Sequence, residues 1–265
     1  MSVIRTERLC RSYGSLQAVS SLDLAVEQGE VFGLLGPNGA GKTTTIKMLA
    51  TLLPPTSGKA FVAGCDVVKQ ALSVRRSIGY VPQLISADGT LTGYENLRVF
   101  ARLYDLPRRE CRPRVLEALD FMGLAQDADR LVKEYSGGMI RRLEIAQSFL
   151  HRPRVLFLDE PTIGLDPGAR RTVWERIEHL RREFNTTILM TTHQMEEAED
   201  LCTRVAIMHH GVVAASGTPA ELKQAAGGGE VSLDDVFIHY TGDKLDSGGN
   251  YRETDRTRRV ARRLG

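Results

Sequence analysis

The feature that most constrains the fold of this chain is a glycine-rich segment that ends in lysine and threonine. It fits the pattern G-x-x-x-x-G-K-[ST] and reads Gly36, Pro37, Asn38, Gly39, Ala40, Gly41, Lys42 and Thr43. The compact apolar run 30–35 precedes it, and apolar residues at helical spacing follow it as far as Leu53, just before two prolines. This order predicts a strand, a loop and a helix, which is the phosphate-binding unit of an α/β fold.

The chemistry of this loop favours a bound triphosphate. Glycines let successive backbone amides point toward one anion, and the positive end of the following helix adds to the field. We expect Lys42 to neutralise the β and γ phosphates and the Thr43 hydroxyl to bind Mg2+, with Thr44 also in the binding loop. The alternative is a chance glycine-rich turn with a surface lysine, and the strand and helix on either side disfavour it.

The spacing of apolar residues elsewhere predicts the rest of the fold. Residues 155–158 and 187–190 are near-continuous apolar runs, typical of parallel strands that are covered on both faces. Alternation over 22–26 predicts a half-buried antiparallel strand, 204–215 can form a hairpin, and between about 88 and 153 the spacing becomes helical. The predicted fold class is α/β: a P-loop nucleoside triphosphatase core of parallel strands with an antiparallel β subdomain and an inserted helical subdomain at about 88–153.

Two adjacent carboxylates, Asp159 and Glu160, follow the apolar run 155–158. Ligands of parallel α/β sheets gather at the carboxyl ends of the strands. Asp159 fits a contact to Mg2+, usually through water, and Glu160 fits a base for the water that attacks the γ phosphate. Paired acids at strand ends are common, but the buried run before this pair and the P-loop in the same chain favour the catalytic interpretation.

A second candidate anion site lies in the segment 135–139, Tyr-Ser-Gly-Gly-Met. Its backbone amides, from Ser136, Gly137 and Gly138, would cluster at the N-terminus of a helix. The apolar face of that helix runs through Ile140, Leu143, Ala146 and Leu150. By itself the segment is an ordinary helix start, and its position just upstream of the Asp159 strand favours the second site.

This ordered set of motifs resembles the nucleotide-binding subunits of ABC transporters up to about residue 242. In that family the segment 135–139 is the signature motif, which is supplied to the γ phosphate of ATP bound by the other subunit. The resemblance implies an ATPase domain over 1–242, ATP and Mg2+ as ligands, and a head-to-tail dimer with a second copy of the chain that encloses two ATP molecules. We expect the polar, basic segment 243–265 to be disordered.

Four further residues receive roles from the resemblance. Tyr13 matches the aromatic residue that stacks on adenine, and Gln83 matches the loop residue that touches Mg2+ and the attacking water. His193, at the end of the second buried run, matches the switch histidine that contacts the γ phosphate. Asp166 matches the loop that crosses the dimer interface, and it also suits the cap of a helix that begins at Pro167. Outside this context, each of these residues reads as an ordinary turn, loop or structural position.

The sequence departs from the family pattern at three places. Tyr135 stands where Leu is usual, Met139 replaces the common Gln, and Ile163–Gly164 replaces a more usual Ser-Ala pair. The residues that supply the backbone amides, 136–138, are intact, so we expect activity to survive.

The segments 135–143, 161–167 and 234–237 look like those of daunorubicin-resistance exporters of the ABC-2 type. That resemblance implies ATP hydrolysis coupled to outward transport of a drug, lipid or other amphipathic compound through a separate membrane permease, at the cytoplasmic face of the membrane. The alternative is a soluble ABC ATPase that acts on ribosomes or DNA, but such relatives generally carry two cassettes or a long coiled-coil insertion. A P-loop kinase would leave residues 136–138 and His193 without a role.

Composition fits an ordinary globular chain. The formal net charge is only +2, with 42% apolar and 26% charged residues, which argues against general nucleic-acid binding. No apolar run approaches the roughly 18 residues of a membrane-spanning helix. The four cysteines are far apart, which predicts neither a disulfide framework nor a zinc site.

Overall fold

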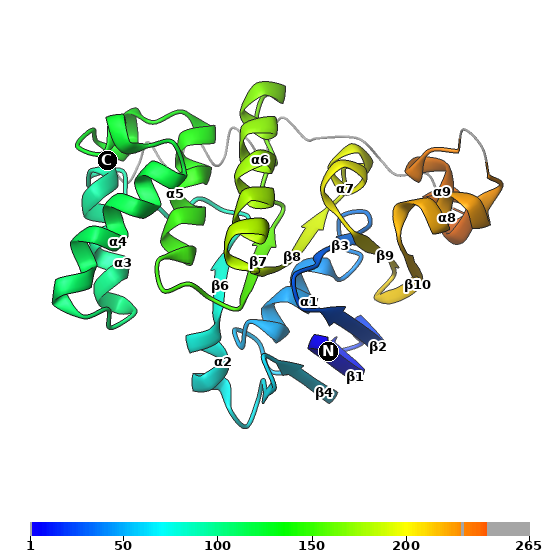
Figure 1. Cartoon of the computed structure of the whole chain (residues 1–265). Helices are drawn as coiled ribbons and strands as arrows, with labels where there is room; N and C mark the ends of the chain where they lie inside the picture. Colours follow the sequence, from blue (N-terminus) through cyan, green and yellow to red (C-terminus); the bar gives the residue numbers. More distant parts are fainter. Residues whose placement is uncertain (1, 229–230, 243–265) are drawn as a thin grey trace. The chain divides into compact units, whose positions relative to one another are not determined.

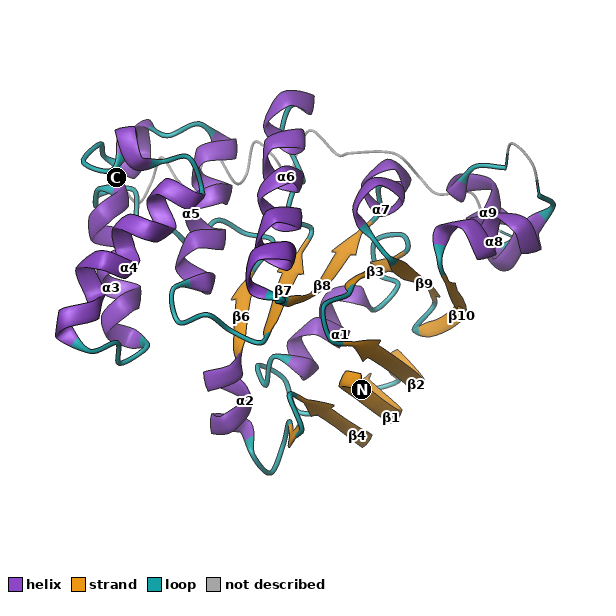
Figure 2. Ribbon diagram, viewed as in Figure 1, coloured by secondary structure: helices purple, strands orange, loops and turns teal. Residues whose placement is uncertain are grey.

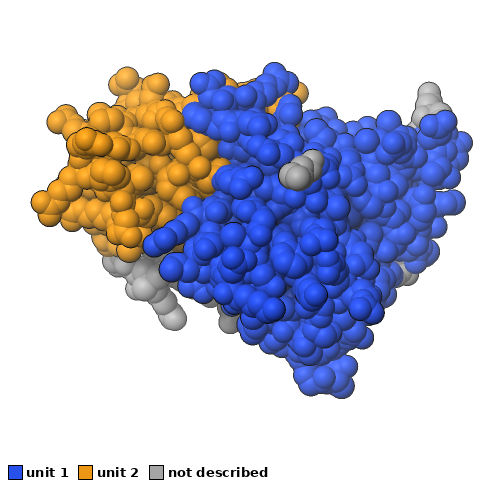
Figure 3. Space-filling view, turned by 60° about the horizontal axis from the view of Figure 1, so that its bottom comes forward, with its two compact units in different colours: residues 1–80, 154–160, 181–247 blue, residues 81–153, 161–180, 248–265 orange. Residues whose placement is uncertain are grey.

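The computed structural model describes residues 2–228 and 231–242, which fall into two compact units (Figure 3). Of the described residues, unit 1 comprises 2–80, 154–160, 181–228 and 231–242, and unit 2 comprises 81–153 and 161–180. Unit 2 therefore enters the sequence of unit 1 as two insertions. The expected disordered tail, 243–265, lies outside the described residues.

The strands form two sheets (Figure 1). One sheet has four strands in the order β2-β1-β4-β5, and the other has six in the order β10-β9-β3-β8-β7-β6. The strand bounds are β1 Ser2–Tyr13, β2 Leu16–Glu27, β3 Val31–Leu35, β4 Ser57–Val62, β5 Cys65–Asp66, β6 Ile78–Val81, β7 Val155–Asp159, β8 Thr187–Thr192, β9 Arg204–His209 and β10 Val212–Gly217.

Helices make up most of the remaining described chain. Their bounds are α1 Lys42–Leu49, α2 Ala71–Ser77, α3 Gly93–Leu103, α4 Arg108–Phe121, α5 Gly137–Phe149, α6 Pro167–Phe184, α7 Met195–Leu201, α8 Pro219–Ala226 and α9 Leu233–Thr241, with short 3-10 helices η1 Ala125–Asp127 and η2 Val132–Glu134. Within residues 2–228 and 231–242, none of these helices has the length and apolarity needed to cross a bilayer.

The predicted strand types are confirmed. β1 pairs antiparallel with both β2 and β4, and on β2 the side chains of Leu22, Leu24 and Val26 are buried while those between them are not. β3, β7 and β8 pair in parallel and are buried along their whole length, as expected for strands covered on both faces. α1 lies between the two sheets of unit 1 (Figure 2), where Ile46 and Leu49 join the main hydrophobic core.

The register of the parallel strands brings three chain segments to one edge of the sheet. Leu35 at the end of β3 is level with Thr192 at the end of β8, and Asp159 at the end of β7 is level with Thr191. The residues that directly follow β3, β7 and β8 are therefore neighbours at the carboxyl edge. This is the edge where α/β sheets bind their ligands.

The C-terminal part of unit 1 contains the predicted hairpin, formed by β9 and β10. Its two turn residues, His210 at φ 47 and Gly211 at φ 80, both have the left-handed conformation that a two-residue type I′ turn requires. The apolar patch at 236–238 lies within α9, which begins after a Ser232 capping box.

The end of α1 differs from the sequence prediction. α1 ends at Leu49, before the two prolines, because Thr51 takes a left-handed conformation at φ 62 and turns the chain out of the helix. Leu53 therefore packs against the core from the following turn. On α6 the buried side chains are those of Val173, Trp174, Ile177 and Leu180.

Candidate active site

The P-loop is held tightly between neighbouring backbone segments of unit 1. A Cβ atom on Gly36, which has φ 153, would lie 2.2 Å from the carbonyl oxygen of Met208 in β9. A Cβ atom on Gly41, at φ 105, would lie 2.5 Å from the carbonyl oxygen of Ala18 in β2. Glycine is therefore required at both ends of the loop, for conformation and for space.

The N-terminus of α1 suits an anion. Its cap residue is Gly41, which has no side chain to accept from the first-turn N–H groups, and the first turn contains no acidic residue. The first N–H groups of a helix have no partner within the helix, and the helix dipole makes this end positive. Lys42, Thr43 and Thr44 thus present backbone donors at the carboxyl edge of the sheet, as a phosphate group requires.

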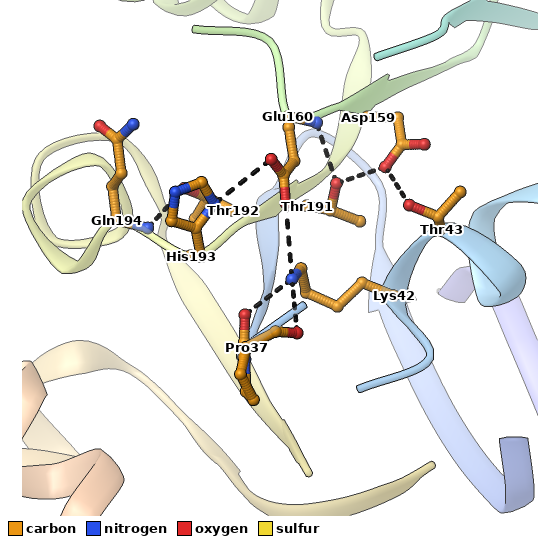
Figure 4. A network of polar contacts seen from close by, with 10 residues as sticks. Pro37, Lys42, Thr43, Asp159, Glu160, Thr191, Thr192, His193 and Gln194 are labelled. Carbon is orange, nitrogen blue, oxygen red and sulfur yellow. Dashed lines mark hydrogen bonds and ion pairs between the residues drawn. The ribbon is translucent and has the colours of Figure 1, made fainter. Parts of the chain in front are cut away.

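Lys42 points into the loop rather than into solvent. Its Nζ donates to the carbonyl oxygens of Gly36 at 2.7 Å and Pro37 at 3.1 Å, and it lies 3.6 Å from Glu160 Oε1 (Figure 4). Burial lowers the pKa of Lys42, while the nearby carboxylates of Glu160 and Asp159 act in the opposite direction. The ammonium group is placed where it can neutralise a phosphate.

Asp159 forms a compact oxygen cluster with two threonines. The hydroxyl of Thr43 donates to Asp159 Oδ1 at 2.9 Å, and the hydroxyl of Thr191 donates to the same oxygen at 2.7 Å. Within residues 2–228 and 231–242, no group of three or more His, Cys, Asp or Glu side chains is placed to hold a metal ion. A carboxylate and a hydroxyl fit Mg2+, which is usually held by one or two protein oxygens together with substrate phosphates.

Glu160 lies at the centre of the charged residues. Its backbone has φ 48, an uncommon conformation for a non-glycine residue, and its N–H donates to the hydroxyl of Thr191 at 2.9 Å. Glu160 Oε2 lies 3.3 Å from His193 Nδ1, whereas Lys42 approaches the other carboxylate oxygen, Oε1 (Figure 4). Burial alone would raise the pKa of Glu160, but His193 and Lys42 outweigh burial and hold the pKa below its ordinary value. A carboxylate that stays ionised can accept a proton from water.

Tyr13 is at the end of β1, next to the hairpin turn into β2, and 46% of it is exposed. The guanidinium of Arg11 lies 4.6 Å from the centroid of its ring. Tyr13 pairs with Leu16 in the sheet, and two residues further along β2 the carbonyl of Ala18 faces Gly41. An exposed aromatic ring therefore stands close along the chain to the point where β2 approaches the P-loop.

Unit 2 contains the segment 136–138 and Asp166. Ser136 caps α5, because its hydroxyl accepts from the N–H of Met139 at 3.3 Å. A Cβ atom on Gly138 would lie 2.8 Å from the Cβ of Ala169, and one on Gly137 would lie 3.4 Å from Leu165 Cδ2, so the start of α5 packs against the start of α6. Asp166 caps α6 by accepting from the N–H of Ala169 at 2.9 Å, which confirms the predicted start at Pro167.

Tyr135, which stands where the family usually has leucine, lies against Gly93. The hydroxyl of Tyr135 donates to the carbonyl oxygen of Asp127 at 2.6 Å, and a Cβ atom on Gly93 would lie only 2.2 Å from that hydroxyl oxygen. The extra bulk of tyrosine is therefore accommodated by the missing side chain of Gly93.

We expect Gly93→Ala to lower the free energy of unfolding by about 1–3 kcal/mol, the usual cost of overpacking a filled site. In a chain that also carries Tyr135→Leu the same Gly93→Ala change should cost clearly less, because the hydroxyl is gone. Urea denaturation of the four variants measures this difference, and equal costs in both backgrounds would show that the two residues do not share this space.

A buried polar network in unit 2 was not predicted. Arg141 of α5 donates to the carbonyl oxygens of Pro82 at 2.8 Å and Gln83 at 2.9 Å, and Glu144 of α5 accepts from Ser86. In the sequence the two charged residues look like an exposed helix pair. No local signal marks them as buried, because the loop that covers them is almost sixty residues earlier in the chain.

The structure brings five of the predicted residues together in unit 1: Lys42, Thr43, Asp159, Glu160 and His193. A loop of backbone donors, a buried lysine, a hydroxyl beside a carboxylate, and a second carboxylate between a lysine and a histidine are the features of a P-loop nucleoside triphosphatase. Gln83, residues 136–138 and Asp166 belong to unit 2, where the last two are neighbours.

Comparison with known proteins narrows this class. Residues 19–163 match the ABC transporter family. The chain is 48% identical over 230 residues to a daunorubicin/doxorubicin resistance ATP-binding protein of Streptomyces peucetius, covering 87% of this chain and 69% of that protein. It is 41% identical over 245 residues to a Nod factor export ATP-binding protein of Cupriavidus metallidurans, covering 92% of this chain and 78% of that protein. A solved ATP-binding subunit of an ABC transporter superposes with a TM-score of 0.80 at 30% identity, covering 91% of this chain and all of that one.

The chain belongs to the ABC transporter family, as an ATP-hydrolysing subunit. The predicted fold class is confirmed by the same comparisons.

Proposed function

We propose that this chain hydrolyses ATP at the carboxyl edge of its six-stranded sheet and thereby powers an exporter. The observation that carries the proposal is the Lys42–Glu160–His193 array beside the Thr43–Asp159 pair. In this proposal Lys42 binds the β and γ phosphates, Glu160 accepts the proton of the attacking water, and His193 contacts the γ phosphate.

Mg2+ would supply charge neutralisation between the β and γ phosphates. Thr43 and Asp159 are the residues that would hold it, Thr43 directly and Asp159 through water. The resemblance adds Gln83 as a further contact to Mg2+ and to the attacking water. Thr191 would keep the Asp159 carboxylate oriented through its hydroxyl.

Tyr13 would stack on the adenine ring. We expect Tyr13→Ala to weaken ATP binding by roughly 5-fold to 150-fold, the equivalent of about 1–3 kcal/mol per stacked base. Tyr13→Phe keeps the ring and should bind within about twofold of the original chain. Titration with a fluorescent ATP analogue measures both, and wild-type affinity in the alanine variant would refute the stacking role.

A second copy of the chain would complete each ATP site. Ser136, Gly137 and Asp166 are exposed on unit 2, and the first turn of α5 offers backbone donors that Ser136 satisfies only in part. This arrangement supports the γ-phosphate contact that the resemblance assigns to the signature motif. Sedimentation of the chain with ATP and Mg2+, compared with ADP, tests whether ATP drives dimer formation.

The membrane partner would be a separate permease, and the transported compound would be a drug, lipid or other amphipathic molecule carried outward. The names of the relatives support this proposal, since one is a Nod factor export protein and others are daunorubicin/doxorubicin and linearmycin resistance proteins. Unit 2 also exposes apolar side chains suited to a protein partner, Leu84 and Ile85 after Gln83, and Val99 and Leu103 on α3.

Isolation of the tagged chain from detergent-solubilised membranes tests the partnership. Recovery of a polytopic membrane protein in fixed ratio, with ATPase activity that responds to an amphipathic compound, is the expected result. Co-sedimentation with ribosomes or DNA instead would favour the soluble alternative, which none of the relatives named above supports.

A further inference from the structure

One face of α5 carries polar side chains that are buried rather than solvated. Arg141, Glu144 and Gln147 are each at most 5% exposed and follow one another at intervals of three residues. Residues at this spacing share a face of a helix. The face is turned toward the segment 82–96 of the same unit.

This face holds the main chain of the loop that follows Gln83. Arg141 Nη1 and Nη2 donate to the carbonyl oxygens of Pro82 and Gln83 at 2.8 and 2.9 Å. Glu144 Oε1 accepts from the N–H of Ser86 at 2.5 Å and from its hydroxyl at 3.0 Å. Arg141 and Glu144 also pair with each other, Nη1 to Oε2, at 3.0 Å.

The far end of the loop is fixed in the same manner. Asn96 of α3 accepts from the N–H of Asp88 at 3.0 Å and donates to its carbonyl oxygen at 2.9 Å. Gln147 of α5 in turn donates to Asn96 at 3.3 Å. The backbone of residues 82–88 is thus attached to α5 at its first residues and at Ser86, and to α3 at Asp88, where Gln147 links α3 to α5. Leu84 and Ile85 between the attachments expose their side chains.

Such an attachment is costly, which points to a specific task. A buried ion pair offsets the cost of removing its charges from water only when its geometry is good and further hydrogen bonds satisfy the remaining polar atoms. Apolar residues of similar size often give the same or a higher folding stability. Burial raises the pKa of Glu144, and Arg141 and Ser86 act against that rise. A buried pair that loses one member leaves the other uncompensated, so replacing either residue should weaken the attachment of the loop.

We propose that Arg141 and Glu144 are positioning residues that clamp the loop 82–88 to α5, so that the loop carrying Gln83 and the helix start carrying Ser136 move as one body. Arg141 is five positions from Ser136, about 7.5 Å along a helix that rises 1.5 Å per residue. Over that length a helix transmits displacement as a rigid rod. The inference rests on the proposed function, which gives Gln83 and Ser136 their roles at the nucleotide.

The test uses the full chain with Glu160→Gln, in which ATP should hold the dimer together. Arg141→Lys keeps the charge but loses the paired donors, and Glu144→Gln keeps the size but loses the charge. Each should bind ATP as a monomer within about twofold of the parent, measured with a fluorescent analogue at low protein concentration. Each should also need about tenfold more ATP to form the dimer, the loss of about one charge-assisted hydrogen bond.

Arg142→Lys is the matched control. Arg142 is on the same helix and also donates to backbone carbonyls, but those belong to Met122 and Gly123, away from the loop. It should form the dimer at the ATP concentration of the parent. Dimer formation by the Arg141 and Glu144 variants at that same concentration would overturn the clamp, whereas a parent that never dimerises with ATP would instead refute the proposed function.

Hydrogen exchange in the unsubstituted chain tests the clamp without relying on variants that could fold poorly. On addition of ATP and Mg2+, amides in 82–90 and 136–145 should become protected together and over the same range of ATP. Protection of only one of these segments would contradict the clamp even if no variant could be purified. Ser86→Ala, which removes only the hydroxyl contact to Glu144, should loosen 82–90 without lowering monomer ATP affinity.

Discussion

Replacing Glu160 by glutamine should leave ATP bound and hydrolysis nearly absent. The amide keeps the shape of the side chain and its place beside Lys42 and His193, but it cannot accept the proton of the attacking water. Loss of a positioned general base costs roughly 100-fold to 10,000-fold in rate. Phosphate release under saturating ATP measures the rate, and gel filtration should show a dimer that persists as long as ATP is present.

Glu175→Gln is a suitable control, because this glutamate is exposed on α6 and makes no contact in the candidate site. It should hydrolyse ATP at the original rate. Full turnover by the Glu160 variant would remove Glu160 from the role of base and leave Asp159 or a water network to be considered.

Replacing Lys42 by alanine should abolish tight nucleotide binding. The Nζ group is aimed at the interior of the P-loop, where the phosphates of ATP would lie, and no second lysine or arginine of the described residues pairs with Glu160 there. Hydrogen bonds to charged groups contribute about 1.5–3 kcal/mol each, so losing two would weaken binding by 100-fold or more, on the order of 3 kcal/mol at the least. Calorimetric titration with ATP in the presence of Mg2+ measures the loss.

Lys47→Ala tests whether charge on α1 is sufficient. Lys47 is on the same helix but exposed, so its removal changes the net charge equally without touching the loop. It should bind ATP within about twofold of the original chain. If both variants bound equally well, Lys42 would have no special role in holding phosphate.

The strands around the nucleotide edge could be predicted because their residues carry a simple signal. Runs such as 155–158 and 187–190 are apolar at every position, and only a strand covered on both faces requires that. The P-loop identified the strand before it, β3, as the first strand of the site. Asp159 ends β7 and His193 follows β8, so in a parallel sheet both were expected at the same edge as the P-loop. Boundaries were harder, since the end of α1 depends on the left-handed conformation at Thr51, which threonine does not favour.

The contacts of unit 2 could not be predicted from one sequence. Arg141 and Glu144 three residues apart resemble an ordinary surface pair of a helix, and only the fold shows that the loop after Gln83 covers them. The tolerance for Tyr135 likewise depends on Gly93, more than forty residues earlier in the chain. Pairings between distant segments follow from tertiary packing, which local spacing does not encode.

The contacts that Lys42 already makes limit the affinity of this protein for ATP. The ammonium group already has two carbonyl acceptors and a nearby carboxylate, so an incoming phosphate exchanges existing partners rather than meeting a bare charge. The net gain per exchanged bond is small compared with the gross strength of the new one. An ATPase must release its product nucleotide in every cycle. Because Lys42 can donate again to the carbonyl oxygens of its own loop when the phosphates leave, product release should be easier.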